Sequence, residues 1–213
     1  MKIIVLLFVS LSLFGSSISV EDFLTKKINK IIINKVTRNK AKKKKIEILI
    51  NCKLQNKLES LSFMNLNINK IPNLSYFSTI DVLNTQNNKI NNLFYLQSIS
   101  SVKYLNLKSN LVDNLFYLQY LKKLQYLNLS NNKINNISSL KNLKNLKYLN
   151  LSNNKIKNIP YNFSDLDKLI ILDLSNNNIK DISFAKKMKN LKVLIIKNNP
   201  IEFESNSELT IIK

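Results

Sequence analysis

The chain has 213 residues, enough for one domain of fair size, and carries a formal net charge of +20, which favours acidic partners or anionic surfaces. The sequence has no His, which excludes His-dependent catalytic triads and zinc sites with His ligands, and its single Gly lies in an N-terminal apolar run, which excludes glycine-rich loops that cradle phosphate. We therefore predict a protein that is not an enzyme and that needs no cofactor and no metal, and the single Cys, Cys52, excludes an intrachain disulfide.

Residues 1–19 have the pattern of a secretory signal peptide. Lys2 precedes an apolar run from Ile3 to Phe14, and small residues follow, with Ser19 as the expected last residue before cleavage. The alternative is an uncleaved membrane anchor, because no charged residue occurs from Ile3 to Val20. The first interpretation predicts a secreted or extracellular protein, and the second predicts a protein anchored in a membrane by this segment.

Residues 20–57 form a basic flank that holds 12 Lys or Arg and three acidic residues. Lys40 to Lys45 are interpreted as a charged surface linker, with contact to an anionic surface as the alternative. The residues from Ile46 to Ile50 predict a strand that caps the following domain. In the first part of the flank, apolar residues at helical spacing predict a short amphipathic helix. These residues are Phe23, Leu24, Ile28, Ile31, Ile32 and Val36.

From Leu58 onward one template returns, Leu-x-x-Leu-x-Leu-x-x-Asn-x-Ile-x-x-Ile, and it defines a domain over residues 58–213 with a C-terminal cap. Copies start at residues 58, 80, 102, 124, 146, 169 and 191, so the period is 22 residues with one step of 23. The most regular copies start at Leu124 and Leu146. These residues resemble the leucine-rich repeat family, in particular its 22-residue class, which occurs in the regulatory subunit of protein phosphatase 1 and in bacterial internalins.

The resemblance implies an α/β solenoid, a leucine-rich repeat horseshoe with a parallel concave sheet of about seven strands and irregular or short helical convex turns. Alternation along a strand agrees, because it points Leu127 and Leu129 into the core and Tyr126 and Ser130 outward. On the convex side, residues such as Leu140 are expected to pack inward from a loose or helical turn. Stacked repeats then bury a continuous leucine core that one repeat is too small to bury.

The ninth position of six copies holds an Asn at the point where the strand turns toward the core. An amide there can donate to and accept from the backbone of its own repeat and of the neighbouring repeat, so we interpret these residues as a structural ladder. The asparagine ladder consists of Asn88, Asn110, Asn132, Asn154, Asn177 and Asn199.

The third and fifth positions of each copy are expected to line the concave face, which suits a protein partner better than a small-molecule substrate. Tyrosines occupy the third position of three successive copies and asparagines the fifth position of four, a composition typical of binding surfaces. The alternative is that stacked tyrosines only stabilise neighbouring strands. The candidate partner-binding residues are Tyr104, Tyr126, Tyr148, Asn106, Asn128, Asn150 and Asp173.

Five Asn-x-Ser sequons matter if the chain enters a eukaryotic secretory route. Asn128 and Asn150 lie on the predicted concave sheet, where a glycan would obstruct binding. The other three sequons begin at Asn73, Asn136 and Asn162.

The leading hypothesis is a secreted, non-enzymatic protein that binds a protein partner of unknown identity through its concave face. The first alternative is an intracellular scaffold similar to the phosphatase regulators. The second is a basic protein bound to an anionic membrane surface, in part through Lys40 to Lys45. Nucleic acid is not an expected partner, because no recognised nucleic-acid-binding motif accompanies the basic residues.

Overall fold

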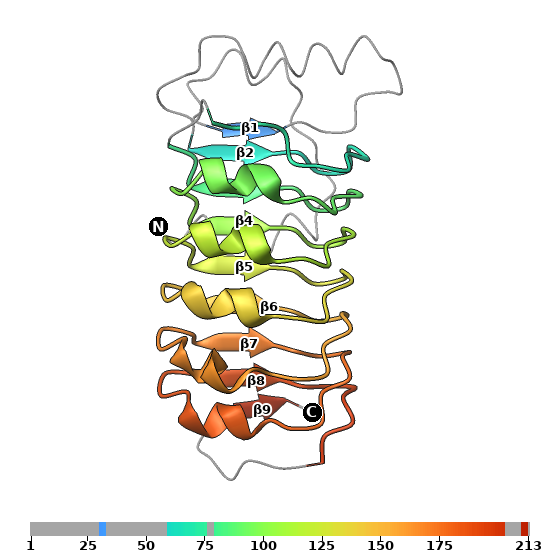
Figure 1. Ribbon diagram of the computed structural model, residues 1–213, viewed down its shortest axis with the longest axis vertical. Coiled ribbons are helices and arrows are strands. Elements are labelled where there is room, and N and C mark those ends of the chain that lie inside the picture. Colours follow the sequence, from blue (N-terminus) through green and yellow to red (C-terminus); the bar gives the residue numbers. More distant parts are fainter. Residues whose placement is uncertain (1–29, 33–58, 76–78, 203–209, 213) are drawn as a thin grey trace.

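The computed structural model describes residues 30–32, 59–75, 79–202 and 210–212, and these form one elongated stack of coils (Figure 1). The predicted signal peptide, the Lys40 to Lys45 run, the strand expected at Ile46 to Ile50 and Cys52 lie outside the described residues.

One parallel sheet runs along the whole stack, and its strands are paired in chain order. Each repeat adds one strand of three residues, and equivalent positions of successive repeats are in register, as when Leu127 of one strand pairs with Leu149 of the next. The described strands are β1 (Lys30–Ile32), β2 (Ser60–Ser62), β3 (Val82–Asn84), β4 (Tyr104–Asn106), β5 (Tyr126–Asn128), β6 (Tyr148–Asn150), β7 (Ile171–Asp173), β8 (Val193–Ile195) and β9 (Thr210–Ile212). The predicted leucine-rich repeat solenoid is confirmed.

The described sheet has nine strands, whereas about seven were predicted. The template places β2 to β8, but β1 and β9 lie outside it and pair with the two ends of the repeat sheet. The amphipathic helix predicted for the flank is wrong at Lys30–Ile32, which form a strand. An open sheet edge presents unpaired N–H and C=O groups, and pairing with them outweighs a weak helical pattern.

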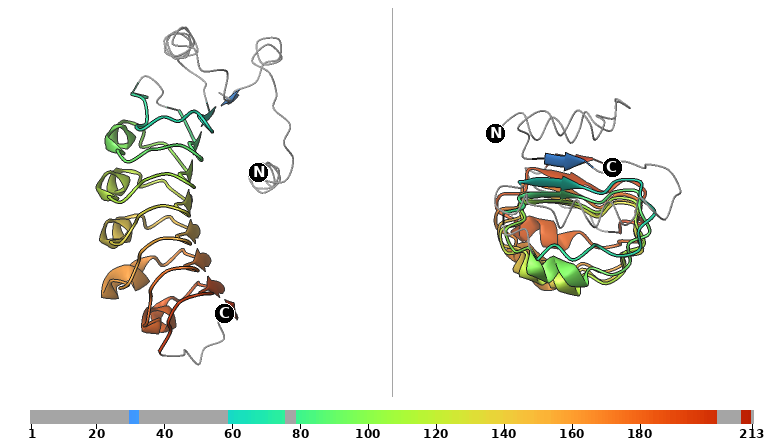
Figure 2. Two further views of the ribbon diagram at one scale, coloured as in Figure 1. Left: turned by 90° about the vertical axis from the view of Figure 1, so that its right-hand side faces the viewer. Right: turned by 90° about the horizontal axis from the view of Figure 1, so that it is seen from above.

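In the described part of the chain, five 3-10 helices cover the opposite side of the stack, one in each of the repeats that start at residues 80, 102, 124, 146 and 169 (Figure 2). They confirm the prediction of short helical turns there, and each points an apolar residue such as Leu96, Leu118 or Leu140 into the core. The helices are η1 (Phe94–Ser98), η2 (Phe116–Tyr120), η3 (Ser138–Asn142), η4 (Tyr161–Asp165) and η5 (Ser183–Lys187).

The leucine core lies between the sheet and these helices. Leu127 and Leu129 are fully buried, as the alternation predicts. Ser130 was expected to point outward, but it is only 4% exposed, and its Oγ donates to Asn128 Oδ1 at 2.8 Å. The chain turns away from the sheet directly after the strand, so the alternation no longer applies at Ser130.

The 23-residue repeat keeps its place in the stack through a variant outer turn. Pro160 precedes η4 with a φ of −59°, and Tyr161 after it is 88% exposed. The core position passes to Phe163, which is buried and meets Phe184 of the next repeat edge to face at 5.8 Å. A Phe therefore fills the place that Leu occupies in the neighbouring turn, and the extra residue is accommodated outside the core.

The asparagine ladder connects successive repeats through the backbone. Asn132 Nδ2 donates to the carbonyl oxygens of Leu107, Leu129 and Ser130 at 3.0, 3.0 and 3.2 Å. Its Oδ1 accepts from the N–H of Val112 in the preceding repeat at 2.9 Å. The other ladder residues bond in the same way, so each side chain satisfies backbone groups that the turn leaves without a partner.

The residue before each ladder position has a left-handed backbone conformation. Asn131 and Asn153 both have a φ of 55°, and Ser109 has the same value in the third repeat. In a body without Gly, Asn is the residue that tolerates this region best. The Asn-Asn pairs in the repeats therefore divide two tasks, because the first residue makes the turn and the second bonds the neighbouring repeat.

Candidate partner-binding surface

Three tyrosines form a row across the centre of the concave sheet. Tyr104, Tyr126 and Tyr148 come from β4, β5 and β6, which lie side by side (Figure 1), and the register places them opposite one another. The rings of Tyr126 and Tyr148 are stacked, with centroids 4.5 Å apart and planes 4° apart, and Tyr104 lies 6.3 Å from Tyr126. All three are half-buried, so the tyrosine row forms a continuous aromatic surface with ring faces packed together.

The middle tyrosine of the row, Tyr126, has a tyrosine on each side. Burial, together with the neighbouring Tyr148, raises the pKa of Tyr126 to about 12, while a hydrogen bond with Asn128 acts in the opposite direction. The phenol of Tyr126 is therefore neutral near physiological pH.

The fifth-position residues use their oxygens within the fold. Asn106, Asn128, Asn150 and Asp173 each accept a hydrogen bond from the backbone N–H two residues later, at 2.9 to 3.0 Å. Asn106 is also buried and donates to Gln86. These groups hold the turn at the end of each strand.

Asn150 also bonds side chains beside it on the concave face. Its Nδ2 donates to Asp173 Oδ2 at 3.0 Å, and it lies 3.4 Å from the Tyr148 hydroxyl. These bonds hold Tyr148, Asn150 and Asp173 in one polar-aromatic group. A partner that covers Tyr148 therefore also meets the Asn150 amide and the second oxygen of Asp173.

A charged pair borders the tyrosine row. Lys103 Nζ lies 2.8 Å from Asp81 Oδ2, and the hydrogen bond with this carboxylate raises the pKa of Lys103. Sequence reasoning missed the pair, although its signal is present, because residues 22 apart occupy the same position in adjacent repeats. The pair is partly exposed and adds little stability, but it gives the edge of the row a defined charge pattern.

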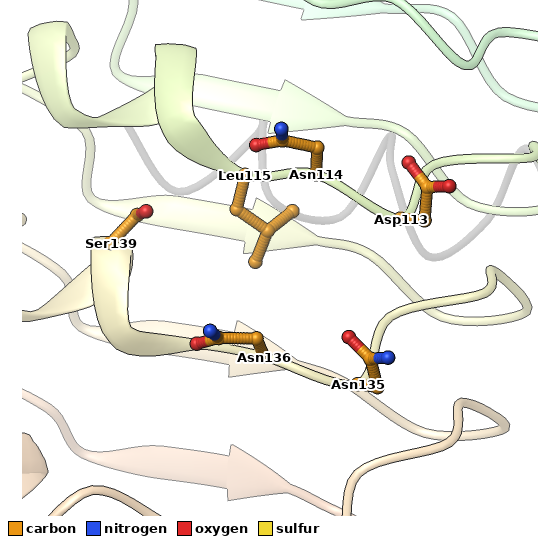
Figure 3. A pocket seen from close by; sticks show the side chains of 6 residues that line it. All are labelled: Asp113, Asn114, Leu115, Asn135, Asn136 and Ser139. Atoms are coloured by element: carbon orange, nitrogen blue, oxygen red, sulfur yellow. The ribbon is translucent and has the colours of Figure 1, made fainter.

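A shallow pocket of about 410 Å³ lies away from the tyrosine row, between the third and fourth repeats (Figure 3). Its wall is mostly polar, with Asp113, Asn135 and Ser139 among the lining residues. Asn114 and Asn136 also line it, but their Oδ1 atoms accept from the N–H groups of residues at the starts of η2 and η3. The part of the chain that the structure describes holds no group of three His, Cys, Asp or Glu residues suited to a metal.

The sequons lie in three different settings. Asn73 and Asn136 are exposed, and each accepts from the N–H of the sequon Ser through Oδ1. Asn128 and Asn150 lie on the sheet, where Oδ1 accepts from both the N–H and the hydroxyl of the sequon Ser. Asn162 lies in η4.

The repeat geometry agrees with sequence and structural comparisons. The family described as Leucine Rich repeats (2 copies) matches residues 122–168 and 167–209. The chain is a leucine-rich repeat protein. The solved structures add neighbours of the same architecture, and 433 matching chains indicate a widely used fold. The leucine-rich repeat fold is commonly a protein-interaction scaffold, so the likeness supports a binding role without specifying a partner.

Three solved structures illustrate the similarity. An internalin (inlF) of Listeria monocytogenes is 26% identical with a TM-score of 0.68, and the match covers 73% of this leucine-rich repeat protein and 47% of the internalin. Internalin C2 of the same species is 28% identical with a TM-score of 0.64, over 75% of this chain and 81% of that one. A leucine-rich repeat protein of Leptospira interrogans is 30% identical with a TM-score of 0.69, over 74% and 43%.

The chain therefore spans less than half of two of these three proteins. No curated protein matches the sequence significantly. None of the helices in the described ranges has the length and apolarity needed to cross a membrane.

Proposed function

We propose that this leucine-rich repeat protein is a secreted, non-enzymatic module that binds a protein partner through its concave face. The tyrosine row carries the proposal. Tyr104, Tyr126 and Tyr148 offer a large aromatic area with few rotatable bonds, the kind of surface that supplies much of the energy at protein interfaces. Asn128, Asn150 and Asp173 would border the contact, with hydrogen-bonding atoms held in place by the strand-end turns, whereas Asn106 is buried and donates to Gln86.

Secretion is supported by the N-terminal pattern of residues 1–19 and by the likeness to internalins. The test is fractionation of cells that express the chain with a C-terminal tag. We expect the tagged protein in the medium, shortened by a length that corresponds to cleavage after Ser19. A full-length chain confined to the cytosol would instead support the intracellular scaffold.

The concave surface is tested by affinity capture with the secreted chain, followed by mass spectrometry of the retained proteins. The test variant changes Tyr104, Tyr126 and Tyr148 to Ser, and we expect it to lose the partner while the repeats stay folded. Each tyrosine is expected to contribute about 2 kcal/mol or more to binding, whereas each cross-strand contact stabilises the fold by only about 0.2–1 kcal/mol.

The control variant changes Lys122, Lys141 and Lys144 to Ser on the outer face and is compared at low and moderate salt. It is expected to retain the partner at both salt concentrations. Retention by the tyrosine variant together with loss by the lysine variant would contradict the concave proposal.

A further inference from the structure

Two successive outer helices share their first four residues, and in both helices an aromatic side chain is exposed on the outer surface of the solenoid. Both η1 and η2 begin with Phe-Tyr-Leu-Gln, at Phe94 and at Phe116. A 3-10 helix has three residues per turn, so only every third residue faces the core. In η1 that residue is the buried Leu96, and in η2 it is the buried Leu118. Phe94 and Phe116, the first residues of the two helices, are exposed, whereas Tyr95 is half-buried and Tyr117 packs partly against the core.

These residues form one outer aromatic cluster, which consists of Phe94, Tyr95, Phe116, Tyr117 and Tyr120. Phe94 meets Tyr117 of the next repeat at 5.4 Å with planes at 74°, and Phe116 meets Tyr120 at 6.3 Å. Phe94, Phe116 and Tyr120 remain 43%, 49% and 41% exposed. They are half of the six large hydrophobic residues exposed in the described part of the chain, so the exposure is concentrated at one place.

Positive charge lies beside this cluster, on the side of η2 and η3. Lys122 and Lys123, which follow Tyr120 after the buried Leu121, are exposed, and the neighbouring helix η3 carries Lys141. The outer segments of five repeats, residues 94–101, 116–123, 138–145, 161–168 and 183–190, contain eight Lys and two Asp. A second copy of the same face would be repelled, whereas an anionic surface would be attracted.

We propose that the outer aromatic cluster and the lysines beside it dock the protein on an anionic lipid bilayer. Phe94 and Phe116 would enter the boundary between headgroups and acyl chains, and the tyrosine hydroxyls would stay at headgroup level. Lys122 and Lys123 would contact the lipid phosphates. Stable attachment of a peripheral protein usually needs both an apolar and a basic contribution, and this face offers both. The face is opposite the concave sheet, so a docked protein keeps the tyrosine row accessible.

The test uses the full chain and flotation with phosphatidylcholine vesicles, with and without phosphatidylserine, at low and physiological salt. Changing Phe94 and Phe116 together to Ser is expected to weaken binding to the phosphatidylserine vesicles by about tenfold. The matched control is Tyr161→Ser, because Tyr161 occupies the same part of another outer helix, is 88% exposed and lies outside the cluster. It is expected to bind as the unchanged protein does.

A second pair of variants tests the charge. Lys122→Ser with Lys123→Ser is expected to weaken binding to phosphatidylserine vesicles but not to phosphatidylcholine alone. Lys155→Ser with Lys157→Ser removes the same charge from an exposed loop and is expected to have no such effect. If the phenylalanine variant fails to fold, Gln97→Glu, which places a negative charge on η1 and leaves every ring in place, is expected to weaken binding in its stead.

A local probe distinguishes membrane contact made by the cluster from membrane contact made by the N-terminal apolar run or the basic flank. This distinction is needed because all the variants above retain those two segments. In a Cys52→Ser background, a polarity-sensitive dye on Gln97→Cys is expected to shift to shorter wavelength on vesicles, whereas the same dye on Lys157→Cys is expected not to shift. An unshifted dye at position 97, or unchanged vesicle binding after both phenylalanines are replaced, would overturn the proposal. A sedimentation experiment would also overturn the proposal if it showed a dimer that dissociates when both phenylalanines are replaced. The cluster would then be a contact between two copies of the protein.

Discussion

The amide nitrogen of Asn132 lies 3.0 Å from the carbonyl oxygen of Leu107, a residue 25 positions earlier in the chain. The same side chain also bonds its own repeat and accepts from Val112. One polar group thus joins two repeats at a buried position, where an unpaired backbone group is costly.

We predict that Asn132→Ala lowers the free energy of unfolding by about 3 kcal/mol, because it leaves several buried backbone groups without partners. Urea unfolding followed by circular dichroism measures the change. Asn135→Ala serves as the control, since Asn135 is exposed and a small effect is expected there. A loss of unfolding free energy in Asn132→Ala as small as that in Asn135→Ala would mean that the ladder adds no stability.

The left-handed turn offers a stabilising substitution. Ser109 has a φ of 55° where most other repeats have Asn, and Ser adopts this region less readily. Ser109→Gly is expected to raise the free energy of unfolding by up to about 1 kcal/mol. Relief of the left-handed strain, about 1–2 kcal/mol for a residue other than Gly, outweighs the conformational entropy of about 0.4–1 kcal/mol that Gly adds to the unfolded chain. Ser138→Gly, in the 3-10 helix η3, is expected to be neutral or destabilising. A Ser109→Gly protein with a lower melting temperature would contradict this account.

The core register is tested by Leu149→Asp. Leu149 is fully buried in a middle repeat, so the change removes apolar contacts and buries a carboxylate, at a cost of about 4 kcal/mol or more. Ser152→Ala is expected to cost about 1 kcal/mol, because Ser152 is 6% exposed and its hydroxyl donates to Asn150 Oδ1 at 2.7 Å. Thermal unfolding of both variants shows which one loses more stability. An unchanged melting temperature for Leu149→Asp would be incompatible with this core.

Tyr126 is expected to make stability depend on alkaline pH. Its pKa is about 12 in the folded protein and about 10 in an unfolded chain, so the unfolded state loses this proton first as the pH rises. The stabilising contribution is therefore complete below about pH 10 and lost as the pH rises toward about 12.

Tyr126→Phe should reduce this alkaline loss of stability, measured by urea unfolding at several pH values. Carbon NMR of the tyrosine ring in the unchanged protein should find Tyr126 still protonated at a pH where exposed tyrosines have ionised. A Tyr126 that ionises near its ordinary pKa would contradict this prediction.

The sequence by itself determined the solenoid, because a period of 22 residues with apolar alternation leaves one way to bury the leucines of every copy. It placed Tyr104, Tyr126 and Tyr148 on one face, since each occupies the same position of a repeat. Only the tertiary structure decided which side chains are buried beyond the ends of the strands, where the alternating pattern no longer applies. Ser130 is buried because the chain bends after the strand, and Lys30–Ile32 form a strand because the open edge of β2 offers partners that no local pattern encodes. The outer aromatic cluster likewise exists because stacking brings η1 against η2, a contact between residues about one repeat apart.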